Sequence, residues 1–433
     1  MAFARRVGPG FFPLDEELEL LPGGLTPHLH ECLVRLGAWI PSFDAAGALL
    51  QALTGAYVSE PGVRRKTEAA GAAYVAWQTE EVERIEMALP LAPPGPAKAL
   101  LSVDGVMVPL LHGEWAEVRT LVMGEIQAPV KEKDGWVVHA DKLSYFSRLT
   151  DADAFCRLAL VETQRRGLEN AGQVAAVTDG AEWEQKFIDF HREDAVRILD
   201  FPHAAERISQ CGAVIYGEGA PESQAWLKQR LHALKHEGPT QILTELRELQ
   251  NAHPQASLLR ENLAYLEKRE PHMHYPTYQA EGLPLASGAV ESGNKLVVEA
   301  RLKGAGMHWQ RAHVDPMLAL RNLVCSDRWA EDWPQIASRL RQEVAHRRAS
   351  QRARRRAQAT PHLAETSLPP GPTLEREGVC QPVSPPALPI QPIAPRPTTK
   401  KAPYRPGPDH PWRHSPIGRA RYWTDSWSRL EKT

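Results

Sequence analysis

Three acidic residues occupy positions from which their carboxylates could act together. We expect Asp104 at the end of the first strand of a β-rich region, Asp179 at the end of the fourth, and Glu291 on a later helix. Mg²⁺ prefers hard oxygen ligands, and two Mg²⁺ ions ~3.5–4 Å apart can serve both the attacking and the leaving oxygen of a phosphodiester. If the first and fourth strands are neighbours, both aspartates meet at one edge of the sheet, and the late helix can lay Glu291 beside them.

The helix expected around Glu291 carries a carboxylate where apolar residues are usual. From Val290 the pattern predicts about three turns, which the glycines at 304 and 306 close. At helical spacing one face holds Glu291, Lys295, Val298 and Leu302. A simpler interpretation is that a glutamate in a first turn favours the helix dipole and pairs with a lysine one turn later.

The alternation of apolar residues predicts the elements that would position these acids. Residues 97–111 suggest two short strands with a tight turn at Asp104-Gly105, and residues 115–126 a third strand. A helix is expected from Asp151 to near Gly172. A buried strand follows it and stops at Asp179. The order is then three strands, helix, strand, helix, strand, with a last helix after residue 200.

The first 92 residues are expected to be helical. Two helices joined by a short turn fit a helix-turn-helix, with Ser42 or Asp44 as N-cap and Gly55 at the C-terminal end of the first helix. Early on the second helix lie three basic residues that could contact DNA: Arg64, Arg65 and Lys66. An ordinary helical hairpin with solvated charges fits the pattern equally well. The proline-rich stretch LPLAPPGPAK then forms a hinge.

Two further regions differ in composition from the β-rich part. Residues 204–280 are charged and helical without a strand signal, and Trp226 there could stack on a DNA base, although a core position is the commoner outcome. Residues 281–335 carry the glutamate helix. Residues 336–433 are basic and then proline-rich, and we expect the proline-rich part to be disordered. The basic part could follow phosphates or form a solvated helix, through Arg347, Arg348, Arg352, Arg354, Arg355 and Arg356.

Composition limits the class of protein. The 433 residues carry a net charge of −2, so overall charge indicates no partner. Five cysteines lie far apart without a CxxC pair, which argues against a disulfide framework and against a cysteine zinc site. No apolar run approaches the ~18–20 residues of a membrane span, and no signal peptide is recognisable. We therefore expect a cytosolic protein that does not enter the membrane.

Beyond topology, the acidic segments resemble a known family. The segments SVDGVMV, VTDGAEW and SGAVESGNKLVVEARLKGAGMHW look like the three acidic blocks of bacterial insertion-sequence transposases, closest to the Kra family. The segment LDFPHAAERI fits an aspartate-x-x-histidine motif of related families, here Asp200 and His203. The matches run from the N-terminal helices to about Trp333. The long final block is specific, whereas Asp-Gly alone is a common turn.

The resemblance implies a fold and a chemistry. The fold would be α/β, a ribonuclease-H-like mixed sheet (β-β-β-α-β-α-β-α) with an all-α insertion and a helical DNA-binding domain before it. Asp104, Asp179 and Glu291 would be catalytic and would hold two Mg²⁺ ions, for which Mn²⁺ can substitute, with Asp104 bridging both. The implied domains are residues 1–92 (DNA-binding), 93–203 (first part of the core), 204–280 (insertion), 281–335 (last part of the core) and 336–433 (tail).

The implied partners are the terminal inverted repeats of the mobile element and target DNA, bound by a homodimer or higher oligomer at the bacterial nucleoid. Supporting roles would fall to Asp200 and His203. Lys295 would contact a DNA phosphate or merely pair with Glu291. Further DNA contacts are expected from Arg301 and Lys303. Two alternatives remain open: a DNA-binding protein that has lost catalysis, and a nuclease of the same fold that cuts without joining.

Overall fold

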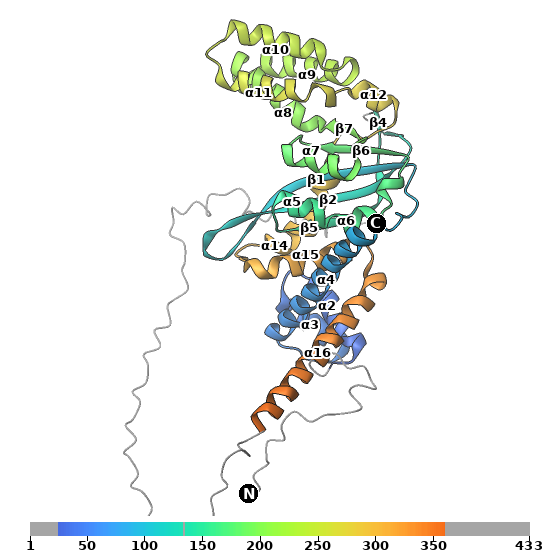
Figure 1. Cartoon of the computed structure of the whole chain (residues 1–433). Helices are drawn as coiled ribbons and strands as arrows, with labels where there is room; N and C mark the ends of the chain where they lie inside the picture. Colours follow the sequence, from blue (N-terminus) through green and yellow to red (C-terminus); the bar gives the residue numbers. More distant parts are fainter. Residues whose placement is uncertain (1–24, 133–134, 360–433) are drawn as a thin grey trace, which may run out of the picture. The chain divides into compact units, whose positions relative to one another are not determined.

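The computed structural model describes residues 25–132 and 135–359, and the predicted proline-rich tail lies outside the described residues. Five strands form a mixed sheet in the order β5-β2-β1-β6-β7 (Figure 1). Their bounds are β1 Lys98–Pro109, β2 Trp115–Ile126, β5 Ala140–Arg148, β6 Gln173–Thr178 and β7 Val196–Leu199. β2 pairs antiparallel with β1 and β5, while β6 is parallel to β1 and β7 is parallel to β6. The first and fourth strands of the sheet are neighbours, which is the condition for bringing both aspartates to one edge.

The predicted turn at Asp104-Gly105 is wrong. Both residues lie inside β1, where Asp104 is opposite Thr120 and Gly105 is opposite Arg119 of β2. Apolar residues on both sides of this dipeptide are buried, so the strand continues through it. Three strands of the main sheet still precede α5, because β5, which the sequence pattern did not reveal, takes the place of the strand lost at this turn. A small hairpin of β3 Val130–Glu132 and β4 Gly135–Val137 lies between β2 and β5.

Helices make up the rest of the described chain. Before the sheet come α2 Pro27–Trp39, α3 Phe43–Thr54 and α4 Glu60–Ala88. Within and after the sheet region come α5 Ala152–Leu158, α6 Leu160–Arg165, α7 Glu182–Arg192 and α8 Phe201–Tyr216. The predicted helical insertion contains α9 Pro221–Glu237, α10 Thr240–Ala252, α11 Ser257–Lys268 and α12 Tyr275–Ala280. The last helices are α13 Gly288–Gly293, the π-helix Asn294–Glu299, α14 Ala300–Leu302, α15 Arg311–Cys325 and α16 Trp329–Ala359.

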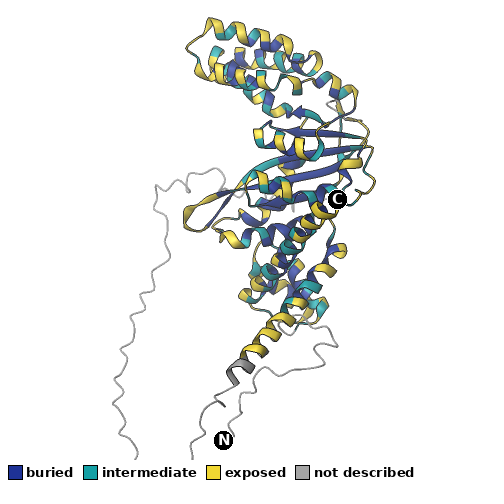
Figure 2. Ribbon diagram, viewed as in Figure 1, coloured by how far each residue is buried: buried dark blue, intermediate teal, exposed yellow. Residues whose placement is uncertain are grey.

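Apolar side chains cover both faces of the sheet, whose strands are largely buried in Figure 2. One face packs Leu101 and Phe146 against Phe155 of α5 and Phe187 of α7. The other face packs residues of β1, β2 and β5 against α13 to α15, through Val108, Val118, Val122, Tyr145, Val290, Val297, Val298 and Met317. β6 and β7 also share a core with α8 and the insertion helices. The sheet is therefore the central layer on which the other elements pack.

The N-terminal helices do not have a core to themselves. Residues of α2, α3 and α4 form one buried cluster with residues of α15 and α16, among them Leu33, Tyr74, Leu320 and Trp333. The predicted caps of α3 are present, because the Ser42 hydroxyl accepts from the Ala45 amide at 3.3 Å and Gly55 adopts φ 74°. Within the described ranges, no helix combines the length and apolar character that crossing a bilayer requires.

Candidate active site

Three aspartates lie at the same level on three adjacent parallel strands. Leu101 of β1 is the register partner of Ala176 of β6, so three residues further along the chain Asp104 and Asp179 share one level. Thr178 of β6 is in turn the partner of Leu199 of β7, which brings Asp200 to that same level. Neighbouring strands are ~4.8 Å apart. The sheet therefore places a row of carboxylates at the carboxyl end of its parallel part.

The charges of this row interact with one another. Burial and the nearby Asp179 carboxylate raise the pKa of Asp104, whereas hydrogen bonds from the Gly105 amide and the Asn294 amide group act in the opposite direction. The Asn294 Nδ2 donates to Asp104 Oδ2 at 2.9 Å. His203 adds a favourable positive charge near both Asp104 and Asp179. A like-charged pair of this kind favours a bound cation.

The helix that carries Glu291 buries a different face from the one predicted. Glu291 and Lys295 are exposed, whereas Val298 and Leu302 are buried, so the predicted shared stripe is wrong. The buried face is shifted by one residue and consists of Val290, Gly293, Asn294, Val297, Val298, Arg301 and Leu302. Residues 294–299 also form a π-helix, which widens the turn. π-turns inside α-helices are frequent at functional sites.

Asp200 ties the beginning of this helix to β7. Its carboxyl group is completely buried and accepts hydrogen bonds from the Ser287 amide at 2.5 Å and from the His203 Nδ1 at 2.6 Å. Asp200 also caps α8 through the His203 amide at 3.0 Å. Although burial alone would raise the pKa of Asp200, the hydrogen bonds from His203 and Ser287 lower it, and Asp200 in turn raises the pKa of His203. The two residues form an ion pair beside the row of carboxylates.

Two contacts fix the path of the Glu291 helix across the aspartates. Ser287 is bonded to Asp200 at β7, and Asn294 is bonded to Asp104 at β1. β6, which ends one residue before Asp179, lies between these strands. Glu291 lies between Ser287 and Asn294 along the chain, one helical turn from each. The structure thus brings Glu291 to the same region as the two aspartates, with its Oε1 3.4 Å from the Ser287 hydroxyl.

The insertion holds the turn that follows Asp179. The Tyr265 hydroxyl of α11 donates to the Asp179 carbonyl, and Arg269 donates to the Gly180 carbonyl at 2.6 Å. The Arg269 guanidinium also lies 3.7 Å from the centre of the Tyr265 ring. Neither residue was predicted from the sequence, because the insertion is far from the acidic segments along the chain. The available signal was a tyrosine followed four residues later by an arginine, at the end of α11.

A fourth carboxyl group lies beside Asp179. Glu184 of α7 is buried and accepts from the Gly180 and Ala181 amides, each at 3.0 Å. Burial and the Asp179 carboxylate raise the pKa of Glu184 to about 10. At neutral pH Glu184 is therefore protonated and holds the turn without adding charge. Asn294, which contacts Asp104, and Glu184, which holds the turn after Asp179, were not singled out from the sequence either.

The donor chemistry of this region fits a hard divalent cation. In the described ranges, no three side chains of His, Cys, Asp or Glu are gathered closely enough to hold a metal ion. Asp104 and Asp179 nevertheless supply a pair of coupled carboxylates, and the buried Asn294 Oδ1 beside them has no hydrogen-bond partner. Oxygen ligands of this kind suit Mg²⁺. Asp104, Asp179 and the nearby Glu291 are the residues that would hold it.

The predicted DNA-contacting residues differ in how exposed their side chains are. Arg64 and Arg65 are exposed at the start of α4, and Lys303 is exposed and donates to Glu299 at 2.7 Å. Lys66 is half-buried, and burial together with Arg65 lowers its pKa. Arg301 is almost entirely buried.

Trp226 and the basic cluster are the two remaining DNA-binding candidates. Trp226 is buried and its Nε1 donates to Glu245 at 2.9 Å, in agreement with a core position. The basic cluster lies on α16, where Arg347 and Arg354 are exposed and the side chains of Arg348, Arg352, Arg355 and Arg356 are outside the described ones.

Comparison with models of known protein families and with curated proteins found no match for this chain. The functional conclusion therefore depends on the geometry and on the acidic segments themselves. A row of carboxylates beside an exposed glutamate, with basic residues elsewhere on the described chain, can bind a divalent ion and a polyanionic substrate.

Proposed function

We propose that the chain is an insertion-sequence transposase, closest to the Kra family, that cleaves DNA strands with Mg²⁺ and joins the freed 3′-hydroxyl to target DNA. The observation that carries this proposal is the shared level of Asp104 and Asp179 on parallel neighbours, with Glu291 held nearby by contacts at both ends of its helix. The mixed sheet, with its first and fourth strands adjacent, is compatible with the ribonuclease-H-like fold that such enzymes use.

The proposed roles follow from the positions of the side chains. Asp104 and Asp179 would hold the metal ions, with Glu291 completing the set. When bound, two Mg²⁺ ions activate the attacking oxygen and stabilise the leaving oxygen of the phosphodiester. Asp200 is a positioning residue. Its buried carboxylate accepts hydrogen bonds from His203 and from the Ser287 amide, and so fixes the segment before Glu291. His203, half-exposed and with a pKa that Asp200 raises, is suited when protonated to attract a DNA phosphate to the row.

DNA containing the ends of the chain's own genetic locus tests the proposal. We expect Mg²⁺-dependent nicking at those ends, followed by joining to a target plasmid. Asp104→Asn, Asp179→Asn and Glu291→Gln should each reduce cleavage by more than ~100-fold, since each removes a carboxylate from the metal site. Glu261→Gln, an exposed acid on α11, is the matched control and should retain full activity. Retained cleavage in any of the three variants removes that residue from the site.

A second candidate, DNA binding without catalysis, is favoured by two observations. The described residues hold no ready-made group of three metal-binding side chains, and Glu291 is exposed. DNA footprinting at the element ends without any strand cleavage in Mg²⁺ or Mn²⁺ would support this reading. Cleaved products that are never joined would instead indicate a nuclease of the same fold.

A further inference from the structure

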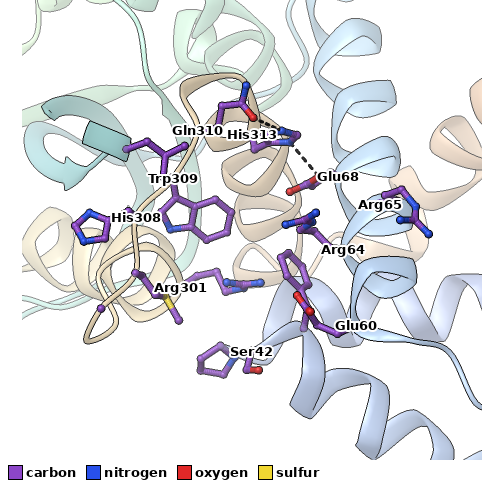
Figure 3. A pocket seen from close by; sticks show the side chains of 15 residues that line it. Ser42, Glu60, Arg64, Arg65, Glu68, Arg301, His308, Trp309, Gln310 and His313 are labelled. Atoms are coloured by element: carbon purple, nitrogen blue, oxygen red, sulfur yellow. Dashed lines mark hydrogen bonds and ion pairs between the residues drawn. The ribbon is translucent and has the colours of Figure 1, made fainter. Parts of the chain in front are cut away.

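A pocket of about 600 Å³ lies away from the aspartates, where the start of α4 meets the segment that follows α14. Figure 3 shows Arg64 and Glu68 of α4 facing Arg301, Trp309 and His313 across it. The segment after α14 is anchored to the β1–β2 connection, because the Trp309 amide donates to the Pro109 carbonyl at 3.1 Å and the Leu111 amide to the Trp309 carbonyl at 2.9 Å. The volume of the pocket falls in the range of small-molecule binding sites.

The pocket contains a buried cation whose charge is not neutralised by direct contact. Arg301 is 2 % exposed, and its guanidinium lies over the rings of Phe43, at 4.4 Å, and Trp309, at 5.2 Å. Its hydrogen bonds to the Gly37 carbonyl are long, at 3.4 Å. Burial, with help from Arg321, lowers the pKa of Arg301 to about 10, which still leaves it charged at neutral pH. A buried charge of this kind is stabilised by a bound anion.

The acidic residues of the pocket do not cancel this charge. Glu68 pairs with the His313 Nδ1 at 3.0 Å and also interacts with Arg64 and Arg301, so its one carboxylate offsets only part of their charge. Glu60 lies one turn before Arg64 on the same helix and is exposed, so it offsets at most one guanidinium. Arg64 and Arg65, at the amino-terminal end of the long helix α4, therefore leave the pocket with an excess of positive charge beside Arg301.

The same pocket offers an aromatic surface with a free donor. Trp309 is 92 % buried (8 % exposed), and its Nε1 has no hydrogen-bond partner. Phe43 meets the Trp309 ring edge to face, with the ring centres 6.5 Å apart. A bare phosphate would fill only a small part of about 600 Å³ and would leave these rings unused. Guanidinium groups for a phosphate beside aromatic rings for a base are the two parts of nucleotide recognition.

We propose that this pocket binds a nucleotide unit, with its phosphate at Arg64 and Arg301 and its base at Trp309. Two sources carry this chemistry, a free nucleoside monophosphate and an unpaired nucleotide of a DNA strand. The pocket contains none of Asp104, Asp179 and Glu291, so the inference does not depend on the proposed catalytic function. It assigns Arg64 and Arg301 to a pocket rather than to a DNA groove.

Equilibrium binding to the full chain, without divalent ions, tests this assignment. The probes are thymidine 5′-monophosphate, the base-free deoxyribose 5-phosphate, an eight-nucleotide single strand and the same strand in a duplex. We expect the nucleotide to bind at least ~10-fold more tightly than the base-free sugar phosphate. Arg64→Ala should weaken nucleotide binding ~10-fold, because it removes a charge-assisted contact to the phosphate. Arg64 is exposed, so its replacement should leave the fold intact.

Arg84→Ala is the matched control, since Arg84 is an exposed arginine on the same helix outside the pocket. A single strand that binds ~10-fold more tightly than the monophosphate identifies DNA as the source, whereas equal affinities identify a free nucleotide. The proposal is overturned if the sugar phosphate binds as well as the nucleotide, if both arginine variants behave alike, or if no probe saturates. None of these results tests DNA cleavage by Asp104, Asp179 and Glu291.

Discussion

Asp200 illustrates how one buried carboxylate can organise a site that it does not complete. It caps α8, pairs with His203 and accepts from the Ser287 amide, which is 87 residues away along the chain. These contacts fix where the helix of Glu291 begins. The aspartate-x-x-histidine spacing thus has a structural reason, because an N-cap residue reaches the amide three residues later. The same spacing places the imidazole next to the carboxylate.

Replacing Asp200 with asparagine should change the titration of His203. The Asp200 carboxylate is the main cause of the raised pKa of His203, so in Asp200→Asn this pKa should fall back toward ~6.5. A histidine with a raised folded pKa contributes stability that is complete below ~6.5 and is lost as pH rises through the raised value. The stability advantage of the wild-type chain should therefore shrink as pH rises above ~6.5.

Nuclear magnetic resonance titration of the His203 ring, with urea unfolding at pH 6 and pH 9, measures both effects. DNA cleavage should also fall in Asp200→Asn, because the segment before Glu291 loses a charged anchor. His253→Gln, an exposed histidine in the insertion, is the control. An unchanged His203 titration in Asp200→Asn would contradict the assigned ion pair.

At the scale of elements, the sequence predicts most strands and helices but not their continuity. The Asp104-Gly105 pair suggests a turn, yet β1 runs through it because its pairing with β2 is unbroken. Residues 140–148, for which the sequence pattern predicted no element, form β5 with their second half buried between β2 and α15. The π-helix at residues 294–299 depends on tertiary contacts that no local pattern encodes. By contrast, Asp104 and Asp179 were identifiable because parallel neighbours align residues at equal offsets.

The close approach of the Glu291 helix to the sheet requires a glycine at position 293. A Cβ atom there would lie 2.8 Å from Val122 Cγ2 and 3.1 Å from the Tyr145 ring, both on buried strands. Gly293→Ala should therefore push the helix away from the sheet and cost about 1–3 kcal/mol of unfolding free energy. Cleavage activity should fall as Asn294 loses its contact with Asp104.

Gly288→Ala is the matched control for this prediction. Gly288 begins the same helix, and a Cβ there would meet nothing within 4 Å. Thermal unfolding and DNA cleavage of the two variants should be compared side by side. If Gly293→Ala unfolds and cleaves like Gly288→Ala, the close packing of this helix does not hold the site.

At the scale of the whole described chain, the two ends of the sequence share one core. α4 packs against α15 and α16, so the predicted boundary near residue 92 does not separate two cores. A buried polar network reinforces the contact, with the Tyr74 hydroxyl 2.5 Å and the Arg165 guanidinium 2.7 Å from the Asp332 carboxylate. α15 therefore links the N-terminal helices to the sheet, because it contacts both α4 and β5 and follows the glutamate helix along the chain.

This shared core predicts what happens when the chain is divided at residue 92. A piece of residues 93–359 would expose the apolar side chains that α2 to α4 now cover, including Leu320, Leu323 and Trp333. We expect it to bind a hydrophobic dye and to lack the single cooperative thermal transition of residues 25–359. Adding residues 25–92 separately should restore both properties, because the missing surface returns. The contrary result would be a soluble piece of residues 93–359 that unfolds cooperatively and binds no dye. It would show that the N-terminal helices are an independent module. In that case α15 would not couple these helices to the row of carboxylates.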